Sequence, residues 1–251
     1  MIRFELIGSV DPILRADFER NDILYCESGA MVSMSESLSL TGKAKGGVFS
    51  AIGRKMLNDE SFFQQKIEAD RGEGFVMLSP TLAGDILLLD VDRYHHYVMA
   101  DGCYLANTEG VTVGMGTQGI GKALFAGTGS GLKGFFTLKA GGRGTLIVSG
   151  FGSMKEIAVT PREPLLVDNG HLVAWSEELK YEVALNTGHT GFFGTMVESV
   201  TSGEGIVLKF SGEGKVIVCS RNRQAFLDWI LRSAPIKPPS SDGGLFTNRR
   251  F

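Results

Sequence analysis

Short apolar runs bounded by glycine dominate the hydrophobic pattern of this chain. Three of them place apolar residues at successive positions: Val76–Leu78, Leu146–Val148 and Val216–Val218. Because neither face of such a segment is polar, we expect strands that are covered on both sides. Other segments suit strands too, either as a fourth apolar run or by strict alternation: Ile86–Leu89, Leu38–Leu40, Val111–Val113 and Tyr181–Val183. The pattern therefore predicts an all-β protein of barrels or sandwiches.

One segment near the C-terminus has the helical period instead. Residues 221–232 place Phe226, Leu227, Ile230 and Leu231 on one face, which predicts a C-terminal helix packed on the β-structure. Residues 234–251 are rich in proline, serine and glycine at their start and should form a flexible tail. A short amphipathic helix is also expected over 49–57.

The chain repeats itself three times. A G-x-G-x turn followed by an apolar run starts at Gly72, Gly142 and Gly212, which are 142−72 = 70 and 212−142 = 70 residues apart. A second block recurs in phase with it, as Ser28–Ser35, Asp101–Thr108 and Asn169–Ser176. Repeated blocks in constant order indicate an internal triplication, in which copies bury a shared face.

The repeat also sets the domain organisation. We expect one triplicated β domain over 1–233, built of β-sandwich or double-stranded β-helix units in a pseudo-threefold arrangement. Its parts are the repeats 1–85, 86–155 and 156–220, the helix 221–232 and the tail 234–251.

Composition narrows the class of protein. Glycine makes up 34 of 251 residues but proline only 7, and 43% of the chain is hydrophobic, which excludes collagen and a disordered chain. The net charge of -3 argues against a strongly basic nucleic-acid binder. Three scattered cysteines, acidic residues that interrupt the N-terminal apolar stretch and the lack of an 18-residue apolar run predict a cytoplasmic protein without a signal peptide.

Two glycine motifs suggest nucleotide binding but lack their context. Gly114–Gly119 matches the dinucleotide fingerprint, yet no acidic residue follows between Glu109 and Glu156. Gly116–Lys122 matches a phosphate loop, but Ala123 stands where Ser or Thr must reach magnesium. The same glycine excess explains both matches, so we assign no cofactor-binding residue.

No catalytic or metal-binding residue is predicted either. The histidines, which have no repeated ligand spacing, are His95, His96, His171 and His189. No G-x-S-x-G elbow is present, and Cys103 fits a small core residue better than a nucleophile.

A basic, aromatic connector is the one candidate contact surface. Every charged residue between Glu109 and Glu156 is basic, and apolar side chains are interleaved with them. Four of them could meet an anionic membrane surface: Lys122, Lys133, Phe135 and Phe136. The alternative is an ordinary solvated loop whose phenylalanines fill the seams between repeats.

The blocks resemble the altered-inheritance-of-mitochondria-24 family. The similarity is carried by Glu27–Met34, Glu60–Phe63, Gly72–Gly74 and Phe210–Val218, and it covers about residues 1–230. The resemblance implies a fold like the tryptophan RNA-binding attenuation protein, with three units per chain in a pseudo-trimer. Its mitochondrial members are linked to inner-membrane organisation, and the family offers no established catalytic residues.

These observations together predict a non-enzymatic scaffold or interaction protein, peripheral to the inner face of a membrane and able to form a homo-oligomer. The alternative is a binding module for a small molecule or RNA, which rests on fold analogy alone. A metal-dependent enzyme is the least favoured expectation.

Overall fold

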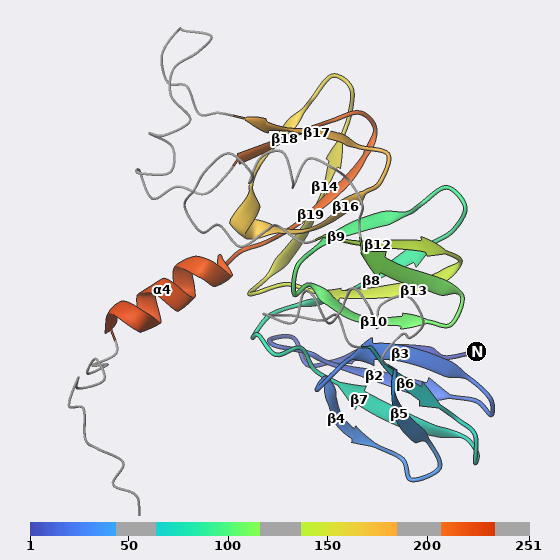
Figure 1. The fold of residues 1–251 in the computed structure, drawn as a ribbon. Helices are drawn as coiled ribbons and strands as arrows, with labels where there is room; N and C mark the ends of the chain where they lie inside the picture. The colour runs from blue at the N-terminus through green and yellow to red at the C-terminus, as the bar shows by residue number, and fades with distance from the viewer. Residues whose placement is uncertain (44–63, 116–136, 185–206, 234–251) are drawn as a thin grey trace, which may run out of the picture.

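The structure is a computed structural model that describes residues 1–43, 64–115, 137–184 and 207–233 (Figure 1). In these residues the chain is mostly β-strand, with four antiparallel sheets and one C-terminal α-helix, so the all-β prediction is confirmed. The helix expected over 49–57 and the tail 234–251 lie outside the described residues.

Most strands follow one another through short turns; residues 44–63, 116–136 and 185–206, which connect β5 to β6, β11 to β12 and β17 to β18, lie outside the described residues. The first group comprises β1 (Arg3–Ile7), β2 (Ile13–Phe18), β3 (Ile23–Glu27), β4 (Met31–Met34), β5 (Ser39–Lys43), β6 (Gln64–Glu68) and β7 (Gly74–Leu78). The second comprises β8 (Ile86–Val91), β9 (Tyr97–Ala100), β10 (Tyr104–Thr108), β11 (Val111–Met115), β12 (Thr137–Gly142) and β13 (Gly144–Ser149). The third comprises β14 (Met154–Val159), β15 (Leu165–Asp168), β16 (Leu172–Ser176), β17 (Lys180–Ala184), β18 (Val207–Ser211) and β19 (Gly214–Cys219), with the short 3-10 turn η1 (Asn169–His171) between β15 and β16.

The three groups use one pairing order. Apart from β1, which pairs with β2, each group has six strands; the first of these six pairs with the last, which also pairs with the third, giving β2-β7-β4, β8-β13-β10 and β14-β19-β16. The remaining strands of each group form β3-β6-β5, β9-β12-β11 and β15-β18-β17. The register of the third strand against the last shifts at the same place in each block, at Val32, Leu105 and Val173.

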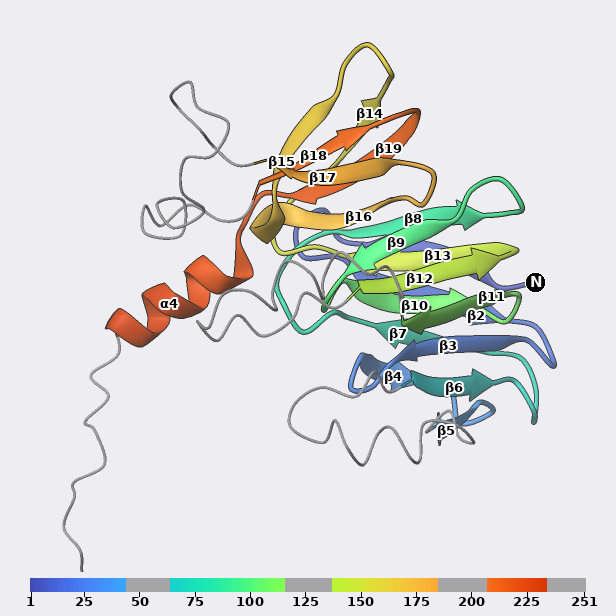
Figure 2. The ribbon, with the colours of Figure 1, turned by 45° about the horizontal axis from the view of Figure 1, so that its top comes forward.

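The groups are stacked along one direction, with the first at the bottom of Figure 1 and the third at the top. Two strand pairings join them: β3 with β10 and β9 with β16, so the two large sheets each run from one group into the next (Figure 2). Three clusters of buried apolar side chains follow the same order. In the third, Trp175 is 1% exposed and lies 5.7 Å from Phe210 between ring centroids.

The strands read from the sequence all exist. The apolar runs fall on β7, β8, β13 and β19, and the alternating segments on β5, β11 and β17. In β13 the last four residues are all buried, as expected for a strand covered on both faces. In β11 the buried Val111 and Val113 flank the exposed Thr112. The triplication and its pseudo-threefold arrangement stay predictions.

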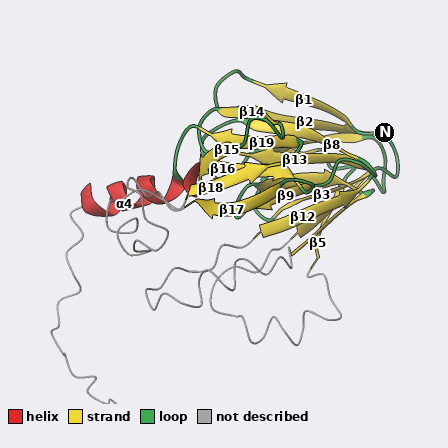
Figure 3. Cartoon of the chain, turned by 90° about the horizontal axis from the view of Figure 1, so that it is seen from above, coloured by secondary structure: helices red, strands yellow, loops and turns green. Residues whose placement is uncertain are grey.

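The C-terminal helix exists, but its expected packing was wrong. Helix α4 (Arg223–Ser233) buries none of its residues and extends away from the strands, as Figure 3 makes clear from above. It begins two residues later than expected because Asn222 caps it: the Asn222 Oδ1 accepts a hydrogen bond of 3.0 Å from the Ala225 N–H.

Candidate interaction site

Helix α4 exposes a group of large apolar side chains. Trp229 is 61% exposed and Leu231 60%, and Leu227 and Ile230 are 39% and 38% exposed. Together with Phe226 these side chains cover about 200° of the circumference of a helix with 3.6 residues per turn, with Trp229 and Leu231 at its two margins, and we call them the α4 apolar face. Exposed apolar side chains gathered on one element mark an interaction surface more often than scattered ones do.

The opposite side of α4 is polar and holds the helix together. Gln224 donates a hydrogen bond of 2.9 Å to the Asp228 side chain, one turn along. Arg232 donates to the Asp228 carbonyl at 3.2 Å, in the last turn, where a cation also suits the helix dipole. The helix is therefore amphipathic, although its apolar side faces solvent in the described part of the chain.

Aromatic contacts fix the N-terminal end of α4, which we call its root, on the β-structure. The Phe226 ring lies 5.1 Å from the Phe151 ring between centroids, and the Arg221 guanidinium lies 5.7 Å from the same Phe151 ring. Phe151 is itself 8% exposed, so it couples the first turn of the helix to the core.

Each copy of the second recurring block has glycine as its second residue, at positions 29, 102 and 170, and we call these the block glycines. Two of them allow the close approach of α4 to the strands. A Cβ built at Gly170 would lie 1.9 Å from the Asn222 side chain, and one at Gly102 would lie 2.9 Å from Arg223. At Gly29, the first glycine of the series, nothing lies within 4 Å of a built Cβ. The absence of a side chain at positions 102 and 170 therefore leaves room for Asn222 and Arg223 at the root of α4.

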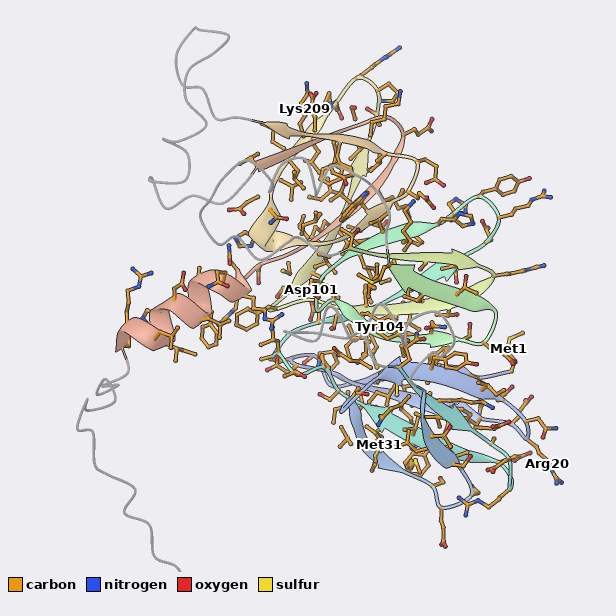
Figure 4. The ribbon with its side chains drawn as sticks, viewed as in Figure 1. Met1, Arg20, Met31, Asp101, Tyr104 and Lys209 are labelled. Carbon is orange, nitrogen blue, oxygen red and sulfur yellow. The ribbon has the colours of Figure 1, made fainter. Side chains whose placement is uncertain are left out.

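A cluster of charges lies beside this root. Burial, with a further contribution from the Asp101 carboxylate, raises the pKa of Glu27 above its usual range, while Arg223 acts in the opposite direction. Asp101 belongs to the turn between β9 and β10, on the side of the strands nearest α4 (Figure 4). The first residue of the helix thus acts electrostatically on the Glu27 carboxylate of the first strand group, as Asp101 of the second group does.

A buried polar cluster joins the first two groups, and we call it the polar junction. Asn107 on β10 is 1% exposed, and its Oδ1 accepts hydrogen bonds from the Tyr104 hydroxyl at 2.7 Å and from the Gln64 amide at 3.0 Å. Its Nδ2 donates to the carbonyls of Thr108 and Val111 at 2.9 and 2.8 Å. All four hydrogen-bonding positions of this amide are used, so the cluster has no room for a polar ligand at Asn107.

Three of the four histidines lie in the described residues, where they are spread over the molecule and hold structural partners; His189 lies outside them. His95 pairs with Asp92 at 3.0 Å, and His96 lies 3.5 Å from Glu177. The His171 Nδ1 donates to the Cys219 carbonyl at 2.8 Å. In the described parts of the chain, no three His, Cys, Asp or Glu side chains come together as a metal site would require.

The cysteines are poor nucleophiles. Burial raises the pKa of both Cys26 and Cys103 to about 12, and it raises the pKa of Cys219 as well. A thiol is reactive as its thiolate, so these groups stay protonated and unreactive at neutral pH. Cys103 packs at the border of the second cluster, which agrees with its interpretation as a core residue.

The basic connector and the nucleotide-like motifs cannot be placed. Lys122, Lys133, Phe135 and Phe136 all lie within 116–136, outside the described residues, and so does most of each glycine motif. The α4 apolar face was missed as a contact surface because its period looked like that of a packed helix. Trp229 was the available signal, since it falls beside the expected buried stripe. Among the described residues, no helix combines the length and apolar character that crossing a membrane requires.

Known proteins are similar to this chain in sequence and in fold. An uncharacterised protein of Streptococcus pyogenes serotype M6 is 33% identical over 241 residues, covering 93% of this chain and 92% of its own length. A crystal structure of a Streptococcus pyogenes protein matches with a TM-score of 0.72 and 31% identity, covering 92% of this chain and 99% of that one. A family model described as mitochondrial biogenesis AIM24 matches residues 4–221, which confirms the resemblance drawn from the sequence. This chain belongs to the mitochondrial biogenesis AIM24 family.

Proposed function

We propose that this protein is a non-enzymatic interaction protein that binds an anionic membrane surface through α4. The observation that carries the proposal is the α4 apolar face, with Trp229 and Leu231 about three-fifths exposed on an arm that points away from the strands. An amphipathic helix with tryptophan and other large apolar side chains over about half of its circumference, and arginines around it, has the composition of an interfacial membrane helix.

Charge supports the same binding mode. Arg221, Arg223 and Arg232 surround the helix, against the single acidic side chain of Asp228 within it. Each basic residue near an anionic bilayer contributes about 1 kcal/mol, and this attraction weakens with salt. The basic connector with Lys122 and Lys133 would add to it if it reaches the same surface.

The β-structure would then serve as a rigid body that carries this helix. We infer that it consists of three copies of one unit of about 70 residues, because the pairing order and the register shift recur in each group. A repeated scaffold of this kind suits presentation of a contact element better than it suits a single catalytic pocket. The engagement of His95, His96 and His171 and the protonated thiols support a role without catalysis.

Vesicle flotation tests the membrane proposal. The protein should float with vesicles of phosphatidylcholine and phosphatidylglycerol and much less with phosphatidylcholine alone, and flotation with the anionic vesicles should fall at high salt. Trp229→Glu should abolish flotation. The matched control Gln224→Glu adds the same charge on the polar side of α4 and should retain most of it. Absence of flotation by the unmodified protein, or equal losses in both variants, would contradict the proposal.

A further inference from the structure

Two junctions inside the chain join strands in the same register. The pairing of β3 with β10 places Cys26 opposite Ala106, and the pairing of β9 with β16 places Met99 opposite Ala174. Cys26 and Met99 each lie three positions before the block glycine of their own group. Ala106 and Ala174 each lie four positions after the block glycine of the following group. One interface is therefore used twice, antiparallel both times.

The strands β15 and β4 carry residues at the same distances from their block glycines, but no described strand of another group pairs with them. Val167 on β15 lies three positions before its block glycine, and Ser33 on β4 lies four positions after its own. Among the described residues, β15 pairs only with β18 and β4 only with β7. The two strands lie at opposite ends of the stack, as Met31 on β4 and Lys209 on β18 mark in Figure 4. They do not pair with each other within one chain.

Exposure distinguishes these two strands from their internal equivalents. Val32 on β4 is 54% exposed, whereas Leu105 and Val173, at the same place in their blocks, are fully buried. Leu166 on β15 is 62% exposed, whereas Val98, at the same place on β9, is 3% exposed. An apolar strand with an unpaired edge is a template for pairing with another chain.

We propose that copies of this chain bind head to tail, with β15 of one copy pairing antiparallel with β4 of the next. The internal junctions give the register: Val167 opposite Ser33 and Leu166 opposite Met34. This inference rests on the strand equivalence proposed above but not on membrane binding. Because each copy carries one of each edge, the contact is heterologous and can continue into a ring or a filament.

Light scattering on a size-exclusion column tests the contact. The unmodified protein should show a mass above that of one chain, and the mass should rise with concentration between about 1 and 100 μM, the range of a modest strand-pairing contact. Ser33→Lys blocks β4, and Leu166→Lys blocks β15, because a lysine on an edge strand opposes pairing. Each variant alone should run as a single chain with an unchanged circular dichroism spectrum.

Mixing the two variants is the decisive measurement. Ser33→Lys keeps an intact β15 and Leu166→Lys keeps an intact β4, so the mixture should form a 1:1 dimer that cannot grow further. Val10→Lys, in the exposed turn before β2, and Trp229→Glu, on α4, should assemble like the unmodified protein. A monomeric unmodified protein, single variants that still assemble, or a mixture that stays monomeric would each overturn the proposal.

Cross-linking tests the register. A short bis-maleimide should join Met34→Cys protein to Leu166→Cys protein, and neither variant should cross-link to itself. Leu165→Cys serves as the matched control, since its side chain points to the other face of the strand and should not react with Cys at 34. Equal cross-linking at 165 and 166 would overturn the register.

Discussion

Replacing Asn107 with leucine should destabilise the protein strongly, although the two side chains are similar in size. The amide uses all four of its hydrogen-bonding positions in a site that is 1% exposed. Leucine would leave the carbonyls of Thr108 and Val111 and one N–H of Gln64 without this partner. A buried polar group that loses its partner costs about 1–3 kcal/mol, and the added apolar burial offsets part of the total. We expect a loss of about 3 kcal/mol in the free energy of unfolding.

Gln64 offers a comparison within the same cluster. Its Oε1 is buried, and among the described residues this polar atom of the native side chain has no hydrogen-bond partner. Gln64→Met removes that atom together with the amide donors, and the Tyr104 hydroxyl still donates to Asn107. We therefore expect Gln64→Met to cost about 1 kcal/mol, clearly less than Asn107→Leu.

Urea unfolding monitored by tryptophan fluorescence measures both effects. In a Trp229→Phe background the signal comes from Trp175, which is buried beside Phe210. With a slope of about 3 kcal/mol per molar urea, Asn107→Leu should lower the midpoint by about 1 M, and circular dichroism should give the same shift. A shift below about 0.3 M, or a larger shift for Gln64→Met, would refute the reasoning on buried partners.

Three further measurements follow from the same structure. Because the pKa of Glu27 is raised in the folded state, folded protein binds that proton more tightly and loses stability as the pH rises past 4.5. Glu27→Gln should remove this loss and raise the urea midpoint at pH 7 relative to pH 4; an unchanged pH profile would contradict it. Gly84→Ala should lower the melting temperature by several degrees, since its Cβ would lie 2.0 Å from the Gly150 carbonyl oxygen, whereas Gly42→Ala, with nothing within 4 Å, should not. Thiol labelling at pH 8 should be slow in the native protein and complete in urea, because burial raises the pKa of Cys26 and Cys103 to about 12; fast native labelling would argue against their burial.

Local chemistry explains why the strands could be predicted. The apolar runs of β7, β13 and β19 are bounded by glycine turns, and these cues act within a few residues. The start of α4 was less accessible, because Asn222 works as a cap through a hydrogen bond that only the folded turn reveals. The polar junction could not be predicted at all, since its members come from β6 and β10, some 40 positions apart.

The sequence by itself determined the strands, their turns and the recurring blocks, because side-chain alternation and glycine turns are local properties. Tertiary structure alone decided which copies of those blocks are buried. Val32, Leu105 and Val173 are equivalent apolar residues, yet only the last two are covered, by β3 and β9 of the preceding groups. Likewise the apolar period of α4 fits a packed helix, but Phe226 is its main anchor and Trp229 faces solvent. Burial depends on which neighbour arrives from elsewhere in the chain, and a local pattern carries no record of that neighbour.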